Sequence, residues 1–160
     1  MAKQLTPGDM AFLDTAHWQI DVVANLEAAP NKVWAALADN QGWAKWFKNC
    51  VSCTSTSTPA DGVGSTRSIN VNGLRVDERF IAWEPEQTWA FTAEKINRGF
   101  ATCLVECVRL SPTERGGTRI DYRMAADPSW WAKPLRAVMS KSVRASWVKS
   151  FATLDKQLRS

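Results

Sequence analysis

Two carboxylates, Glu78 and Glu106, are the first candidates for chemistry, because each lies in an otherwise apolar alternation of residues. A carboxyl group that is buried without a partner has a raised pKa, so it can act as a general acid or base near neutral pH. Arg67 offers a partner for Glu78, since the two residues would face each other across a hairpin. The simpler interpretation of Glu78 is therefore a structural ion pair. Acid–base chemistry stays open for both carboxylates, although neither belongs to a strong catalytic constellation.

Other reactive side chains are few. His17 is the only histidine and precedes the first predicted strand, so we interpret it as a surface residue. Tyr122 is the only tyrosine and falls on an apolar face, which predicts a core position with a partner for its hydroxyl. No phosphate-binding loop, nucleophile elbow or nucleotide fingerprint is present, and we expect no cofactor.

The four cysteines form two close pairs, Cys50-x-x-Cys53 and Cys103-x-x-x-Cys107. Residues three apart on a strand face opposite sides of the sheet, so Cys50 and Cys53 would diverge rather than bind one metal ion. We therefore expect no metal site and interpret the cysteines as reduced thiols. The basic and aromatic residues do not form an RNA-recognition strand motif, which argues against nucleic acid as a partner.

Length and composition indicate one globular domain. The chain has 160 residues, of which 45% are hydrophobic and 22% charged, and its nine tryptophans are unusually many. Residues 128–160 contain seven basic residues and one acidic residue, a net charge of +6, whereas the remainder carries −2. A basic segment of this kind attracts anionic ligands, acidic partners or membrane lipids, or is simply the solvated face of a helix. With no visible signal peptide and no long apolar run, the sequence predicts a cytosolic protein without stable membrane insertion.

Hydrophobic periodicity predicts a short helical region after the first strand and a long helix at the end of the chain. Pro30 suits the first turn of a helix, and Val33, Trp34 and Leu37 give it an apolar stripe. Asn72-Gly73 between two alternating runs predicts a tight hairpin. We expect strands near residues 18–26, 50–57, 65–71, 74–83, 88–94, 100–110 and 118–126, and a helix from about 129 to 158.

Strands joined by short turns favour an antiparallel sheet, so the fold class is α+β with helices on one face of the sheet. We expect residues 1–16 to form an N-terminal arm and residues 17–160 to form a single ligand-binding domain. Apolar residues in the long helix are spaced by four, so its apolar face rotates along its length.

Four passages carry a resemblance to a known superfamily: Ala29-Pro30-x-x-Val33-Trp34-x-x-Leu37-x-Asp39; Trp43-x-x-Trp46; Gly62-Val63-Gly64; and Glu78-Arg79-Phe80-x-x-Trp83-Glu84-Pro85. The pattern, which covers about residues 18–158, resembles the START-like, helix-grip superfamily (SRPBCC). That superfamily includes the pollen-allergen-like proteins and the polyketide cyclase/dehydrase family. The resemblance implies a curved sheet of seven strands around the C-terminal helix, with a deep cavity between them. Members bind sterols, lipids, quinones, plant hormones or polyketide chains, and some catalyse aromatisation or cyclisation.

The resemblance also implies roles for two residues. Trp43 falls on an aromatic position that often borders the cavity. Arg79 falls where some aromatase/cyclases place a pocket arginine that polarises a carbonyl group. The alternation around the hairpin opposes an inward Arg79, because it puts Ile69, Val76 and Glu78 on the inner face instead. An inward Arg79 would leave Ile69, Val71 and Val76 exposed, which would call for a partner subunit and thus for a homodimer.

The sequence thus predicts binding of a small hydrophobic ligand, such as a lipid, quinone or polyketide, in an internal cavity. The predicted lining residues are Trp43, Phe47, Ile69, Phe80, Trp89, Phe91, Tyr122, Leu135 and Met139. One alternative is an aromatase/cyclase-like enzyme that uses Arg79, with Glu78 or Glu106. The other is a non-catalytic interaction protein whose core is completely filled.

Overall fold

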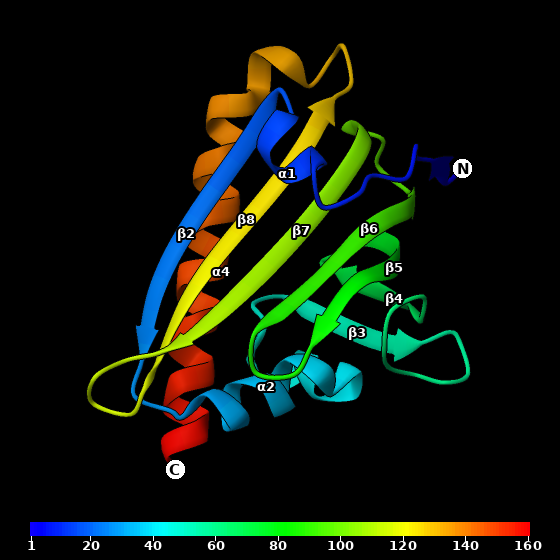
Figure 1. The fold of residues 1–160 in the computed structure, drawn as a ribbon. Coiled ribbons are helices and arrows are strands. Elements are labelled where there is room, and N and C mark those ends of the chain that lie inside the picture. Colours follow the sequence, from blue (N-terminus) through cyan, green and yellow to red (C-terminus); the bar gives the residue numbers. More distant parts are fainter.

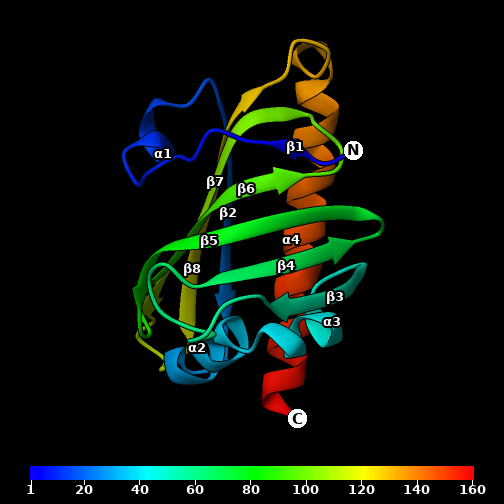
Figure 2. The ribbon, with the colours of Figure 1, turned by 90° about the vertical axis from the view of Figure 1, so that its right-hand side faces the viewer.

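The protein is a curved antiparallel sheet that wraps around one long helix (Figure 1, Figure 2). The computed structural model describes residues 1–160. The main path of the sheet has the order β2-β8-β7-β6-β5-β4-β3, and its neighbours are all antiparallel. Its strands are β2 (Trp18–Leu26), β3 (Cys50–Ser55), β4 (Thr66–Val71), β5 (Leu74–Glu84), β6 (Thr88–Ile96), β7 (Ala101–Pro112) and β8 (Thr118–Pro128). The α+β helix-grip fold expected from the sequence is confirmed.

The β4–β5 hairpin shows why local sequence determines this part of the sheet. Asn72 and Gly73 both have positive φ angles, 50° and 85°, as a tight turn of the primed kind requires. The turn pairs Val71 with Leu74 and carries the register on to Arg67 opposite Glu78. The predicted hairpin and its register are therefore confirmed.

The short helices after β2 close one end of the molecule. They are α2 (Pro30–Ala38), the single 3₁₀ turn η1 (Asn40–Gly42) and α3 (Trp43–Trp46). Pro30 occupies the first turn of α2, where its missing N–H leaves no hydrogen bond unmade. The indole N–H of Trp43 donates to the carbonyl oxygen of Leu37 at 3.0 Å, and this bond folds α3 back against α2.

The long helix α4 (Arg136–Arg159) begins after a 3₁₀ turn, η2 (Lys133–Leu135), which contains Pro134. Its buried residues, Trp147, Ser150, Phe151 and Leu154, lie at its midpoint or in its C-terminal half. Two side chains of this half bind neighbouring elements. Asp155 accepts hydrogen bonds from the backbone N–H groups of Glu27 and Ala28, and Ser150 accepts one from that of Lys48. The C-terminal half of α4 is therefore tied to both ends of the helical region that follows β2.

The sheet has eight strands, one more than the seven expected. Residues 1–16, expected to form an arm, contribute β1 (Lys3–Gln4), which pairs with β6, and the short helix α1 (Phe12–Thr15). Leu13 of α1 packs with Ala90, Val105, Cys107 and Ala125 in a second, smaller apolar cluster. Figure 2 shows α1 on the side of the sheet away from α4. Two-residue strands carry no periodic pattern, which is why the sequence did not reveal β1.

Gly8 allows this N-terminal segment to approach the sheet closely. A Cβ atom on Gly8 would lie 2.5 Å from Cγ2 of Val105 and 3.0 Å from Sγ of Cys103. The substitution Gly8→Ala should therefore lower the free energy of unfolding by about 1–3 kcal/mol, the usual range for overpacking. Chemical denaturation would measure it. Gly99→Ala is the control, because its Cβ would meet only the flexible side chain of Lys3, and it should cost less. Equal losses in the two variants would contradict the close packing of Gly8.

Candidate functional site

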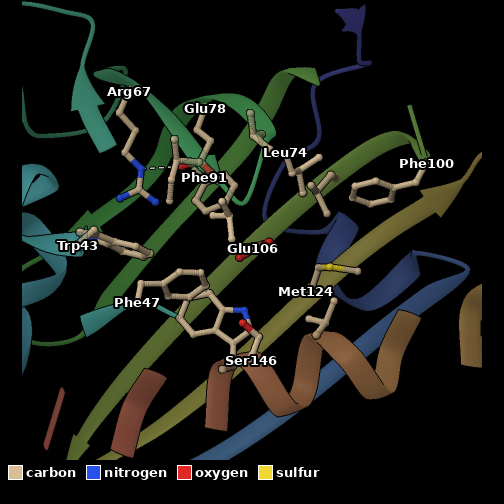
Figure 3. Close-up of a pocket in the computed structure, with 16 residues that line it drawn as sticks. Trp43, Phe47, Arg67, Leu74, Glu78, Phe91, Phe100, Glu106, Met124 and Ser146 are labelled. Carbon is tan, nitrogen blue, oxygen red and sulfur yellow. Dashed lines mark hydrogen bonds and ion pairs between the residues drawn. The ribbon is translucent and has the colours of Figure 1, made fainter. Parts of the chain in front are cut away.

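An apolar cavity lies between the inner face of the sheet and α4 (Figure 3). Its volume is about 160 Å³, and 12 of its 16 lining residues are hydrophobic. The lining comes from α3, from the sheet and from the middle of α4. These residues are Trp43, Phe47, Arg67, Ile69, Val71, Leu74, Val76, Glu78, Phe91, Phe100, Leu104, Glu106, Met124, Val143, Ser146 and Trp147. The core is therefore not completely filled, in contrast to the interaction-protein alternative.

A buried ion pair forms one wall of the cavity. Nε of Arg67 donates to Oε2 of Glu78 at 2.6 Å, and Nη1 of Arg67 donates to Oδ1 of Asn40 at 3.2 Å. Both charged side chains are almost fully buried, with 1% and 4% of their surface exposed. Burial raises the pKa of Glu78, and the charge of Arg67 offsets this in part. The ion pair predicted from the hairpin register is confirmed.

Aromatic rings enclose the Arg67 guanidinium. Its central carbon lies 4.2 Å from the ring centroid of Trp43 and 4.7 Å from that of Trp89. The rings of Phe80 and Phe91 lie 5.3 and 5.6 Å away. A cation over an aromatic face is attracted to its negative potential, so these rings replace part of the hydration that burial removes.

Glu106 brings a second carboxyl group to the cavity. In Figure 3 its side chain extends from β7 into the middle of the space between the sheet and α4. Burial, reinforced by the negative charge of Glu78, raises the pKa of Glu106 to about 8, although Tyr122 and Arg67 act in the opposite direction. The hydroxyl of Tyr122 lies near Glu106 but has no hydrogen bond of normal geometry. At neutral pH Glu106 is therefore mainly a neutral acid that can donate a hydrogen bond into an apolar space.

The cavity brings together several residues predicted to line it: Trp43, Phe47, Ile69 and Phe91. Glu78 and Glu106 also line it. Phe80, Trp89 and Tyr122 are fully buried next to it, in the aromatic packing behind its wall.

The two predicted helix residues, Leu135 and Met139, do not line the cavity. Leu135 is exposed and lies in η2, before α4 begins. Met139 is half-buried and packs against the core outside the cavity. A step of four residues turns a helical position by about 40°, so the three steps from Leu135 to Trp147 rotate it by about 120°. The same spacing placed the later residues Val143 and Trp147 on the cavity instead.

Arg79 does not point into the cavity, and the inward position implied by the resemblance is wrong. Arg79 pairs with Thr66 on the neighbouring strand, so its side chain projects to the face opposite that of Glu78. There its Nε donates to Glu94 at 2.6 Å and its Nη1 donates to the carbonyl oxygen of Gly64 at 3.0 Å. Irregularities in the β5–β6 pairing do not reverse this alternation, since Val76, Glu78 and Phe80 all stay buried. The reason given for a homodimer therefore no longer holds.

Sequence reasoning missed several lining residues. Arg67 was expected only as a partner of Glu78. Leu104 lies on the same face of β7 as Glu106. The alternation that drew attention to Glu106 could therefore also have predicted Leu104 as a lining residue. Asn40, the second partner of Arg67, comes from the turn between α2 and α3, and no pattern in the sequence links that turn to β4.

Residues 17–159 match the family described as "Polyketide cyclase / dehydrase and lipid transport". The chain belongs to this family. An uncharacterised protein of Mycobacterium tuberculosis is 30% identical over 126 residues, which cover 78% of this chain and 75% of that protein. An uncharacterised protein of Mycobacterium bovis matches to the same extent.

Solved structures share the family fold at low sequence identity. XoxI from Bacillus cereus has a TM-score of 0.72 at 12% identity, covering 88% of this chain and 95% of that one. Ara h 8.0201 has a TM-score of 0.70 at 14% identity, with coverage of 88% and 96%. The Aha1 dimer from Colwellia psychrerythraea has a TM-score of 0.67 at 19% identity, with coverage of 88% and 95%. These likenesses establish the fold alone.

No group of three or more His, Cys, Asp or Glu side chains is arranged to hold a metal ion, and the four cysteines are free. His17 is exposed and lies 2.8 Å from Asp127. None of the helices combines the length and the apolar character needed to cross a membrane.

The Arg67–Glu78 pair gives a stability prediction. Arg67→Met leaves Glu78 buried without its counter-charge and should lower the free energy of unfolding by about 3–5 kcal/mol. Arg79→Met breaks the more exposed pair with Glu94 and should cost less than about 1 kcal/mol. Chemical denaturation of both variants tests this. A similar loss for the two would contradict the difference in burial.

Glu106 gives a pH prediction. The folded protein keeps a proton on Glu106 up to about pH 8, whereas an unfolded glutamate loses it near 4.5. The folded state then binds more protons in this window, so the free energy of unfolding falls as pH rises through it. Between about pH 5 and pH 8 the free energy of unfolding of the wild-type protein should fall by about 2–4 kcal/mol more than that of Glu106→Gln, at about 1.36 kcal/mol per pKa unit. The exposed Glu114→Gln is the control and should follow the wild type. Parallel curves for wild type and Glu106→Gln would contradict the raised pKa.

Proposed function

We propose that the protein binds a small hydrophobic ligand in this cavity, as a carrier or sensor. The observation that carries the proposal is an unfilled apolar space inside the core, with a neutral acid at its centre. Apolar surface gains free energy on leaving water, and a few fixed polar groups orient the molecule that enters. The family description, which names polyketides and lipids, supports the same class of ligand.

The size of the cavity limits the ligand. At about 160 Å³ it is smaller than the roughly 300–1,000 Å³ of pockets for drug-sized molecules. It therefore suits a compact group, such as one or two fused rings. A long lipid or polyketide would place only its end in the cavity. We place the mouth at the partly exposed lining residues Val71, Leu74 and Phe100, where the rest of such a ligand would lie.

Glu106 selects for a ligand that carries a hydrogen-bond acceptor. A neutral carboxyl group donates a hydrogen bond, so it favours a ligand with a carbonyl or hydroxyl oxygen in the apolar part of the molecule. Arg67 is less available, because Glu78, Asn40 and the aromatic rings already surround it. We therefore propose an oxygen-bearing ring compound, as in quinones and aromatic polyketides.

A second candidate function is acid catalysis of enolisation or cyclisation in such a ligand. It is favoured by one observation, the carboxyl group with a pKa of about 8 beside the Tyr122 hydroxyl. In this scheme Glu106 would donate its proton to a ligand carbonyl oxygen and later take a proton back. Arg79 has no part in it, since it lies on the outer face of the sheet.

The first test is native mass spectrometry of the freshly purified protein, followed by extraction and identification of any bound compound. A copurified ring compound or lipid supports the binding function and names its class. The binding assays below decide the question if the protein carries no bound compound.

A pair of isosteric probes tests the role of Glu106. 2-Acetylnaphthalene and 2-isopropenylnaphthalene have nearly the same shape, but only the first has a carbonyl oxygen. The wild type should bind the carbonyl compound about fivefold to tenfold more tightly, the value of one net hydrogen bond, and Glu106→Leu should abolish the preference. The preference should also vanish above about pH 8, where the carboxylate can no longer donate. Calorimetry measures both effects, and a preference that survives in Glu106→Leu would contradict this role.

Two tryptophan substitutions on α4 test the location of the ligand. Val143 lines the cavity, whereas Val148 is exposed on another face of the helix. Val143→Trp should fill the space and weaken probe binding at least about tenfold, as expected from steric exclusion in a packed site. Val148→Trp should leave affinity unchanged. Equal binding to the wild type and Val143→Trp would place the ligand elsewhere.

A further inference from the structure

An exposed apolar cluster lies at one end of the molecule, in the connection from β8 into the first turn of α4. Trp130 is 82% exposed, Trp131 40%, Leu135 46% and Val138 72%. We call these four residues the tryptophan tip. Figure 1 shows this connection in orange at one end of the molecule, whereas the C-terminus lies at the other end. The rest of the chain leaves Trp130 and Val138 largely uncovered and Trp131 and Leu135 partly so, and an exposed tryptophan pair is unusual on a monomer surface.

The backbone beneath the tip is held firmly. Ser129 donates its backbone N–H to the carbonyl oxygen of Phe100 at 2.8 Å and its hydroxyl to that of Gly99 at 2.7 Å. Ala132 is fully buried and donates its N–H back to the carbonyl oxygen of Ser129. The two indoles are therefore presented outward by an anchored segment.

Basic residues accompany the tip. Lys133 and Arg136 lie between its residues in the sequence, Lys141 follows on α4, and none of these three forms an ion pair with an acidic side chain. The first turn of α4 has no acidic residue, although acidic groups would stabilise that end of the helix and basic ones oppose its dipole. Stability of α4 alone therefore does not account for the charge at this end.

Tryptophan side chains favour the boundary between lipid and water, and lysine and arginine next to them reach the lipid phosphates. We propose that the tryptophan tip docks the protein peripherally on the surface of an anionic lipid bilayer. The indoles enter the headgroup layer, and Lys133 and Arg136 bind the anionic headgroups. A membrane fits the observations better than an acidic protein, because the tip is an end of the molecule rather than a groove.

Docking also places the cavity mouth near the bilayer. Phe100 lines the cavity, and its carbonyl oxygen accepts the hydrogen bond of Ser129 at the base of the tip. The base of the tip is thus hydrogen-bonded to the turn between β6 and β7, which contributes Phe100 to the cavity lining. Docking stands independently of the ligand proposal, since it rests on surface residues outside the cavity.

Vesicle sedimentation with the full chain tests the proposal. Vesicles of phosphatidylcholine with about one third phosphatidylserine should bind the protein, pure phosphatidylcholine should bind it weakly, and added salt should reduce binding. Lys133→Gln/Arg136→Gln should weaken binding about 25-fold, at about fivefold per basic residue near the surface. Trp130→Ala/Trp131→Ala should weaken it at least about tenfold. All four side chains are exposed, and Arg136 loses only two exposed hydrogen bonds to the carbonyl oxygens of Lys133 and His17, so both variants should stay folded, with a free energy of unfolding within about 1 kcal/mol of the wild type.

The matched control is Lys149→Gln/Lys156→Gln, which removes the same charge from the far half of α4. Lys149 lies about 20 Å along the helix from Arg136, at 1.5 Å per residue, and Lys156 lies farther. This control should change binding less than about threefold, because charges beyond a Debye length are screened.

Equal losses of binding for the two charge variants would overturn the proposed site and indicate that net charge alone drives binding. No binding to the anionic vesicles would overturn the proposal. A dimer that Trp130→Ala/Trp131→Ala dissociates would instead make a second copy of this chain the partner.

Discussion

The fold depends on a charge placed inside an apolar sheet. Arg67 and Glu78 face inward because the Asn72-Gly73 turn fixes the register of β4 and β5, and the inner face of that hairpin must bury Ile69 and Val76. A buried charge is tolerated only with a partner and with polarisable surroundings. Glu78, Asn40 and the rings of Trp43 and Trp89 supply these, and they come from α3, η1 and the sheet. One guanidinium thus connects the helical end of the molecule to the middle of the sheet.

The same pair sets the chemistry of the cavity. The charge of Glu78 adds to the effect of burial on Glu106, which keeps a proton near neutral pH. Two carboxylates in one apolar space divide into a paired one and a protonated one, as repulsion between like charges requires. The cavity therefore offers a hydrogen-bond donor without a free charge, which suits recognition of an uncharged oxygen.

Much of this could be predicted from the sequence where a local rule applies. The alternation of residues and the Asn-Gly turn predicted the hairpin, the inward orientation of Glu78 and its pairing with Arg67. The passages shared with the superfamily predicted the overall fold. Local rules do not predict contacts that depend on how several helices and strands pack together. Asn40 reaches Arg67 only after α2 and α3 have folded, and Leu135 falls outside because α4 starts late and its apolar face turns. The N-terminal strand is too short for a pattern, and Gly8 fits only because of side chains about a hundred residues away in the chain.

The rotation of the apolar face of α4 divides this helix into two functional halves. From its midpoint at Trp147 onward, the helix buries Phe151 and Leu154 and is hydrogen-bonded to the neighbouring elements through Ser150 and Asp155. The turns of α4 before Trp147 bury no residue completely, and they are joined to β2 by the hydrogen bond from the Trp18 indole N–H to Oγ of Ser140 at 2.9 Å. Val143 and Ser146 lie just before the boundary and line the cavity. One helix thus supports the fold through its buried residues and, on its less buried turns, forms part of the cavity wall.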